Sequence, residues 1–174
     1  NTFTDSPKHG EKLIVDPINF YDNATPSGIS ESVKALQKLH SITNNHEYLD
    51  ILISQYSIIG RLIGDFPSGF SNWLKVLLMH NNDTVQVCLL SYDFSSISDM
   101  QKIIYKKFIP NKVIVGNASF PKYKKRSEII SPLFNERSPI EDRPTVFICN
   151  NYNCELPINS VNLLEDSIFG HRAL

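Results

Sequence analysis

One stretch of the chain gathers side chains that could bind an oxygen-rich ligand. Asp22, Ser27 and Ser30 fall within the run Tyr21–Ser30, whose Pro-Ser-Gly triplet marks a turn. A helical pattern follows directly, and the free N–H groups at a helix start favour a carboxylate or a ligand oxygen. The alternative is that these side chains only cap the helix, because capping by Asp and Ser is common.

Two cysteines form the second candidate site. Cys149 and Cys154 are separated by four residues, not by the two of a thioredoxin-like pair. A turn over residues 150–153 would bring them close enough to bridge. They are either a redox pair or two reduced thiols, with Cys149 buried in a strand. No second cysteine pair or nearby histidine completes a zinc site, so we predict no metal. Cys88 is predicted to be a core residue.

The composition is that of an ordinary globular protein. The chain has 174 residues, of which 41% are hydrophobic and 20% charged, so it can bury a real core. A net charge of −1 gives no overall attraction to nucleic acid or membranes. No apolar run reaches the ~18 residues of a membrane span, and residues 1–20 lack the core of a signal peptide. We therefore predict a cytoplasmic protein without nucleic-acid or membrane partners.

The charge is nevertheless uneven. Eight basic residues and no acidic one lie between Lys102 and Arg126. Such a segment is either an anion-binding patch or a solvated helix face followed by a basic loop. The segment contains no nucleic-acid-binding motif, which favours the second interpretation.

Hydrophobic spacing divides the chain into two parts. Apolar residues three and four apart predict helices that begin near Ser27, His46 and Phe70. After residues 81–83, short apolar runs predict strands over 84–92, 112–116 and 145–149. Helices are expected from Ser96 or Ser98 to Phe108, with Phe108 facing inward, over 127–135, and after Ser160. Strands that alternate with helices are typical of parallel crossovers.

We therefore predict a mixed α/β fold with two domains. Residues 1–80 would form antiparallel helices, and residues 81–174 a small three-stranded, mainly parallel sheet with flanking helices. The sequence contains no glycine-rich dinucleotide loop, no phosphate-binding loop and no nucleophile elbow. We therefore predict no cofactor, and we find no self-contained catalytic constellation.

Four motifs in register resemble one known family. Residues 21–30 resemble D-x-A-x-P-S-G-N-S, and residues 108–113 resemble F-x-P-N-x-V. Residues 143–149 resemble R-P-T-A-Y-V-C, and residues 149–157 resemble C-x-N-x-x-C-x-x-P. Together they resemble a thioredoxin-domain-containing family, widespread in bacteria and named after a spermatogenesis-associated member. The resemblance covers about residues 3–166.

The resemblance implies a place in a longer protein. In that family a thioredoxin-like domain precedes an α/α barrel similar to those of six-hairpin glycosidases. This chain, which starts without methionine, would be the C-terminal piece, with residues 1–80 as the last hairpins of the barrel. The implied partners are the thioredoxin-like and barrel domains of the parent protein, together with a carbohydrate ligand.

The resemblance also suggests roles for single residues. Asp22 would be the catalytic carboxylate, and Ser27, Ser30 and Tyr21 would bind substrate at the mouth of a sugar pocket. Sugar chemistry needs paired acids, so the piece alone is expected to be inactive. Ile29 replaces the family's asparagine and removes a hydrogen-bonding group from that pocket.

Two alternatives to the carbohydrate role remain. One is a redox pair, Cys149 and Cys154, that exchanges with the thioredoxin-like domain. The other is a non-catalytic docking module.

Overall fold

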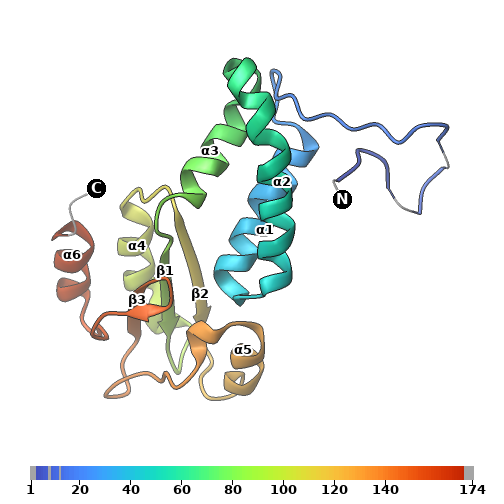
Figure 1. Cartoon of the computed structure of the whole chain (residues 1–174). Helices are drawn as coiled ribbons and strands as arrows, with labels where there is room; N and C mark the ends of the chain where they lie inside the picture. Colours follow the sequence, from blue (N-terminus) through green and yellow to red (C-terminus); the bar gives the residue numbers. More distant parts are fainter. Residues whose placement is uncertain (1–2, 8, 12, 171–174) are drawn as a thin grey trace. The chain divides into compact units, whose positions relative to one another are not determined.

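Three helices fill the first half of the chain, as the sequence predicts. A computed structural model describes residues 3–7, 9–11 and 13–170. It contains α1 (Gly28–Thr43), α2 (His46–Asp65) and α3 (Ser71–His80), with the 3₁₀ turn η1 (Pro67–Phe70) before α3 (Figure 1). The apolar stripes of these helices meet in one core of fully buried side chains: Ile29, Val33, Leu52, Ile59, Phe70, Trp73 and Val76.

The chain divides into two compact units. One consists of the residues up to His40 together with Asn45–Asn82. The other consists of Ser41–Asn44 together with the residues from Asp83 onward. The last residues of α1 and the link to α2 therefore group with the second unit, in which the carbonyls of Ser41 and Ile42 accept side-chain hydrogen bonds.

The second unit is built on a four-stranded mixed sheet. Its strands are β1 (Val85–Leu90), β2 (Lys112–Asn117), β3 (Thr145–Asn150) and β4 (Asn153–Cys154), in the order β2-β1-β3-β4. Between and after them lie η2 (Ser95–Ile97), α4 (Ser98–Lys106), α5 (Lys124–Ile130), η3 (Pro132–Phe134) and α6 (Val161–Gly170). The mixed α/β class predicted from the sequence is confirmed.

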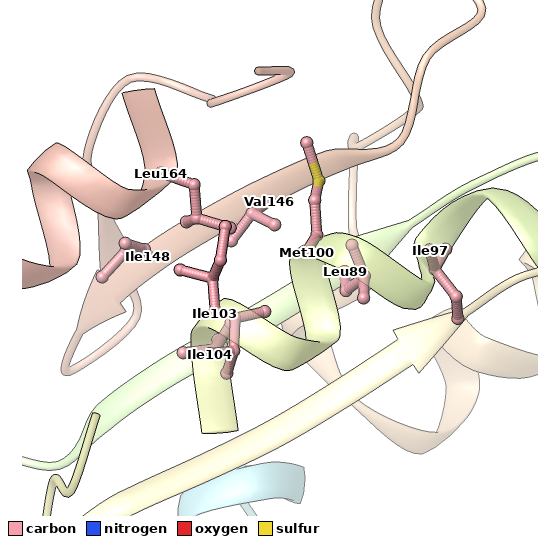
Figure 2. Close-up of a cluster of buried hydrophobic side chains, with 9 residues drawn as sticks. Leu89, Ile97, Met100, Ile103, Ile104, Val146, Ile148 and Leu164 are labelled. Carbon is pink, nitrogen blue, oxygen red and sulfur yellow. The ribbon is translucent and has the colours of Figure 1, made fainter. Parts of the chain in front are cut away.

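Alternation along the strands separates two cores. Val87 and Leu89 of β1 and Val146 and Ile148 of β3 pack with α4 and with Leu164 of α6 (Figure 2). The intervening residues point to the opposite face, because successive side chains of a strand alternate. There Cys88, Leu90, Phe147 and Cys149 pack with Leu133 and Phe134 of η3.

The predicted direction of the third strand is wrong. β1 and β2 are parallel, as expected, but β3 runs antiparallel to β1. Asn117, the last residue of β2, and Thr145, the first of β3, both pair with Leu90. The segment between them therefore starts and finishes at the same end of the strands, on the two sides of β1. A parallel strand would need a connection that runs back to the opposite end of the strands.

Two helix predictions also differ from the structure. α4 ends at Lys106, and Phe108 is 86% exposed instead of facing inward. The backbone turns to extended geometry at Lys107, ahead of Pro110, which disfavours helical geometry in the residue before it. The helix expected over 127–135 begins earlier, as α5, and Pro132 starts the separate turn η3. No helix in the described part of the chain is long and apolar enough to cross a membrane.

Candidate functional site

Asp22 joins the starts of two helices. Its Oδ1 accepts hydrogen bonds from the Ser27 N–H at 2.9 Å and from the Ser30 hydroxyl at 2.8 Å, at the start of α1. Its Oδ2 accepts from the backbone N–H groups of Asn72 at 2.8 Å and Trp73 at 3.3 Å, at the start of α3. The side chain is only 8% exposed. A carboxylate has about four acceptor positions, and these four donors occupy them.

The neighbouring polar residues complete the same network. The Ser27 hydroxyl accepts from the Ser30 N–H at 3.1 Å, which caps α1. The Ser30 hydroxyl accepts from Asn72 Nδ2 at 2.9 Å and is fully buried. Tyr21 lies outside this network: its side chain is 49% exposed, and its ring lies 5.0 Å from the ring of Phe70. The structure thus brings Asp22, Ser27 and Ser30 together as the joint between two helices.

Ile29 points into the core of the first unit. It is 1% exposed and belongs to the cluster around Trp73. At the position where the resembled motif has asparagine, this chain therefore contributes an apolar core contact.

The two cysteines are bridged. Cys149 of β3 and Cys154 of β4 are direct cross-strand partners, with Cα atoms 3.9 Å apart, and their sulfur atoms form a disulfide. The predicted turn over residues 150–153 is what brings them together. Cys149 is fully buried, whereas Cys154 is only partly buried. The expectation of two reduced thiols does not describe this state of the protein.

An arginine distinguishes the two sulfur atoms. Nη2 of Arg137 lies 2.8 Å from Sγ of Cys154 and donates to it. Nη1 donates to the carbonyls of Pro132 at 3.1 Å and Leu133 at 2.6 Å, which fixes the guanidinium at the end of η3. No ion pair joins Arg137 to a carboxylate in the described ranges; its guanidinium contacts the Cys154 sulfur and the two carbonyls, and lies 5.6 Å from the centre of the Phe147 ring.

The third cysteine shares this face of the sheet. Cys88 is buried beside the disulfide cluster and keeps a free thiol. Burial raises the pKa of the Cys88 thiol to about 12, against a smaller lowering by the charge of Arg137. The thiol therefore stays protonated at neutral pH and acts as a core residue, as predicted from its position in the strand.

Several basic side chains of the segment from Lys102 to Arg126 have local partners. Lys102 pairs with Asp99 at 2.9 Å, and Lys106 pairs with Glu165 at 3.1 Å. Lys112 donates to the carbonyls of Ile104 and Lys107 at the end of α4, and burial lowers its pKa. These contacts fit a solvated face. Within the described residues, no group of three His, Cys, Asp or Glu side chains could hold a metal ion.

Sequence reasoning missed Asn72, Gln86 and Arg137. The sequence contains a signal that points to Asn72, because Pro67-Ser68-Gly69 before α3 repeats the Pro-Ser-Gly turn before α1. Gly69 also accepts a hydrogen bond from the Asp22 N–H, at 2.8 Å. Arg137 had no such signal, because it lies in an irregular segment, 17 residues from Cys154 in sequence.

Comparison with known proteins finds distant relatives. The chain is 23% identical over 141 residues to spermatogenesis-associated protein 20 of Mus musculus, and 22% identical to that of Homo sapiens. Each match covers 79% of this chain but only 17% of the relative. No protein-family model and no solved structure matches the chain. The chain is thus distantly homologous to proteins that bear the name of the family its motifs resemble; these relatives are mammalian.

Proposed function

We propose that this chain carries an exchangeable disulfide, Cys149–Cys154, that is reduced by the dithiol of a thioredoxin-type domain. The observation that carries the proposal is the asymmetry of the pair. Cys154 is partly exposed and hydrogen-bonded to Arg137, whereas Cys149 is fully buried. A cysteine beside a fixed cation has a stabilised thiolate, and the accessible sulfur is the one that an incoming thiolate can reach.

The exchange is balanced with a dithiol as the reductant. One thiolate of the dithiol attacks Sγ of Cys154 and forms a mixed disulfide, and the bond to Cys149 breaks. Cys149 leaves as a thiolate and takes up a proton. The second thiolate of the dithiol then attacks its own partner's sulfur and releases Cys154 as a thiolate beside Arg137. Two electrons pass to the cysteine pair, and the dithiol becomes a disulfide.

Trapping the mixed disulfide tests the assignment of the two cysteines. A single-cysteine variant of a bacterial thioredoxin, activated as a mixed disulfide with thionitrobenzoate, is added to Cys149→Ser and to Cys154→Ser. We expect capture by Cys149→Ser, in which Cys154 is free, at least tenfold faster than by Cys154→Ser. Equal rates, or faster capture by Cys154→Ser, would reverse the assignment. Failure of a native thioredoxin system to reduce the wild-type disulfide without unfolding would show a purely structural bridge.

The role of Arg137 has its own measurement. In the reduced protein, Arg137→Gln removes the cation beside Cys154, and a rise of one unit in the pKa of that thiol lowers its thiolate fraction about tenfold. We expect alkylation of Cys154 at pH 7 to slow by about that factor, with the pH profile shifted upward. Arg143→Gln is the matched control, because Arg143 is an exposed arginine of the same unit. Equal slowing in both variants would contradict the proposal.

The carbohydrate role and the docking role remain predictions for a longer parent protein. Both rest on the motif resemblance, including the barrel-like assignment of residues 1–80. In the described residues the Asp22 carboxylate has no acceptor position left for a sugar hydroxyl, so the geometry favours the redox proposal.

A further inference from the structure

The disulfide closes a turn with an unfavourable backbone. Cys149 and Cys154 are bridged at the base of the hairpin of β3 and β4, whose two turn residues are Asn151, with φ of 48°, and Tyr152, with φ of 66°. Asparagine tolerates this left-handed region, but a bulky residue such as tyrosine rarely adopts it. Surrounding contacts must therefore hold Tyr152 in place, and the covalent bridge at the base of the turn is one of them.

Tyr152 and Gln86 together hold the end of helix α1. The Tyr152 hydroxyl donates to the carbonyl of Ser41 at 3.0 Å, and Nε2 of Gln86 donates to the same carbonyl at 2.8 Å. Oε1 of Gln86 accepts from the Tyr152 N–H at 2.7 Å. Gln86 is 1% exposed, and it is the residue of β1 that pairs in register with Cys149. We call Gln86, Tyr152 and Ser41 the latch.

The latch supplies hydrogen-bond donors to a backbone carbonyl that has no partner within helix α1. The last four carbonyls of an α-helix have no partner within the helix, and Ser41 carries one of them in α1. Burial raises the pKa of the Tyr152 hydroxyl, and a backbone hydrogen bond from Asn44 lowers it by a smaller amount, as expected of an N–H that donates to the hydroxyl oxygen. A separate bond joins the Ser131 hydroxyl to the carbonyl of Ile42. The segment Ser41–Asn44 is therefore anchored in two places, and only the latch includes the turn between the cysteines.

We propose that the redox state of Cys149–Cys154 sets whether the latch is closed. This inference rests on the proposed function, since it needs a reducible disulfide. With the bridge formed, the turn keeps Tyr152 in its left-handed conformation, with its hydroxyl on Ser41. Reduction releases the base of the turn, Tyr152 relaxes toward negative φ, and its hydroxyl leaves the helix end. Reduction thus loosens the link between α1 and α2 while the Ser131 anchor remains.

Hydrogen exchange at the Asn44 amide tests the latch. We compare the oxidised wild type, the wild type reduced by dithiothreitol, and the double variant with Cys149→Ser and Cys154→Ser. Loss of one buried hydrogen bond corresponds to an exchange rate about tenfold higher. We expect that acceleration in the reduced protein and in the double variant.

Two further variants separate the latch from general loosening. Tyr152→Phe removes only the hydroxyl, so Asn44 should exchange fast in both redox states and lose its dependence on the disulfide. Ser131→Ala removes the other anchor, so exchange should rise while the redox dependence persists. Unchanged Asn44 exchange in the double variant would overturn the latch.

The outcomes for the latch and for the proposed function are distinguishable. If the thioredoxin system leaves the wild-type disulfide intact but the double variant exchanges fast, the latch stands and the proposed function fails. If the disulfide is reduced and Asn44 exchange is unchanged, the latch fails and the function stands. Should the double variant misfold, the reduced and alkylated wild type gives the same comparison.

Discussion

Replacing Asp22 should uncouple two helices of the first unit. Its carboxylate is 8% exposed and accepts four hydrogen bonds, two at the start of α1 and two at the start of α3. Asp22→Ala removes all four acceptor positions, so the start of α3 loses both bonds to the carboxylate and the start of α1 keeps only the Ser27 hydroxyl as a cap. The loss of one N-terminal cap costs about 0.5–2 kcal/mol, so the loss at two helix starts suggests about 1–4 kcal/mol in the free energy of unfolding.

Asp22→Asn supplies the graded comparison. The amide keeps one acceptor oxygen and so preserves one of the two caps. Its NH₂ group faces the N–H donors of the other helix start and cannot accept from them. We therefore expect a loss of about half that of Asp22→Ala, roughly 0.5–2 kcal/mol in the free energy of unfolding.

The assay follows the single tryptophan of the chain. Trp73 is fully buried in the core of the first unit, so its fluorescence reports the unfolding of that unit in urea. For an m value of about 2 kcal/mol per M, a loss of 3 kcal/mol lowers the midpoint by about 1.5 M. Asp93→Ala is the control, because Asp93 is an exposed, hydrogen-bonded aspartate of the other unit.

If Asp22→Ala keeps the Trp73 transition within about 0.5 kcal/mol of the wild type, the carboxylate does not hold the two helix starts. Asp22 would then be free to serve a ligand, and the carbohydrate prediction would gain weight.

Two further predictions concern buried side chains. Ile29→Asn places an amide in the apolar core around Trp73 and should lower the free energy of unfolding by about 3–4 kcal/mol, whereas Ile29→Val should lower it by about 1 kcal/mol. Both losses are measured by tryptophan fluorescence. A loss below about 1 kcal/mol for Ile29→Asn would show that position 29 is open to solvent. For Cys88, burial raises the thiol pKa from 9.0 to about 12. Above pH 9 the unfolded chain loses the thiol proton while the folded protein keeps it. The contribution of Cys88 to the free energy of unfolding is therefore complete below pH 9 and falls by about 1.4 kcal/mol per pH unit above it. Cys88→Ala should lack that slope between pH 9 and 11 in denaturation followed by circular dichroism; equal slopes would contradict the assignment.

The helices and strands were predictable where their pattern is local. The broad apolar stripe of α2 (His46–Asp65) set its bounds, and continuous apolar runs marked β1 and β3. Strand direction is not a local property. The apolar run 145–149 is the same pattern for either strand direction, and the structure shows that residues 118–144 start and finish at the same end of the strands. The course of residues 118–144 depends on tertiary packing, and hydrophobic periodicity along the sequence gives no information on that packing.

The candidate site shows the same division between local and distant information. The cap at Asp22 was visible because Ser27 and Ser30 follow it within eight residues, at the start of the predicted helix. Asp22 also accepts hydrogen bonds from the N–H groups of Asn72 and Trp73, which lie about 50 positions away in the sequence. The repeated Pro-Ser-Gly turn was the sequence signal for this second cap. The short turn between the cysteines was enough to predict that they lie close together. The position of Arg137 could not be predicted in the same way, because the carbonyls of η3 fix its guanidinium.

Strand alternation explains why the redox pair and the helix end share one glutamine. Gln86, Cys88 and Leu90 of β1 point to the same face, and pairing in register places Gln86 opposite Cys149. A polar side chain buried at that position needs partners, and those it finds are the turn between the cysteines and the carbonyl of Ser41. An apolar residue at position 86 would avoid that requirement, but it would also remove the polar link between the disulfide turn and α1. Gln86→Leu should therefore leave the disulfide intact and weaken the dependence of Asn44 exchange on its redox state.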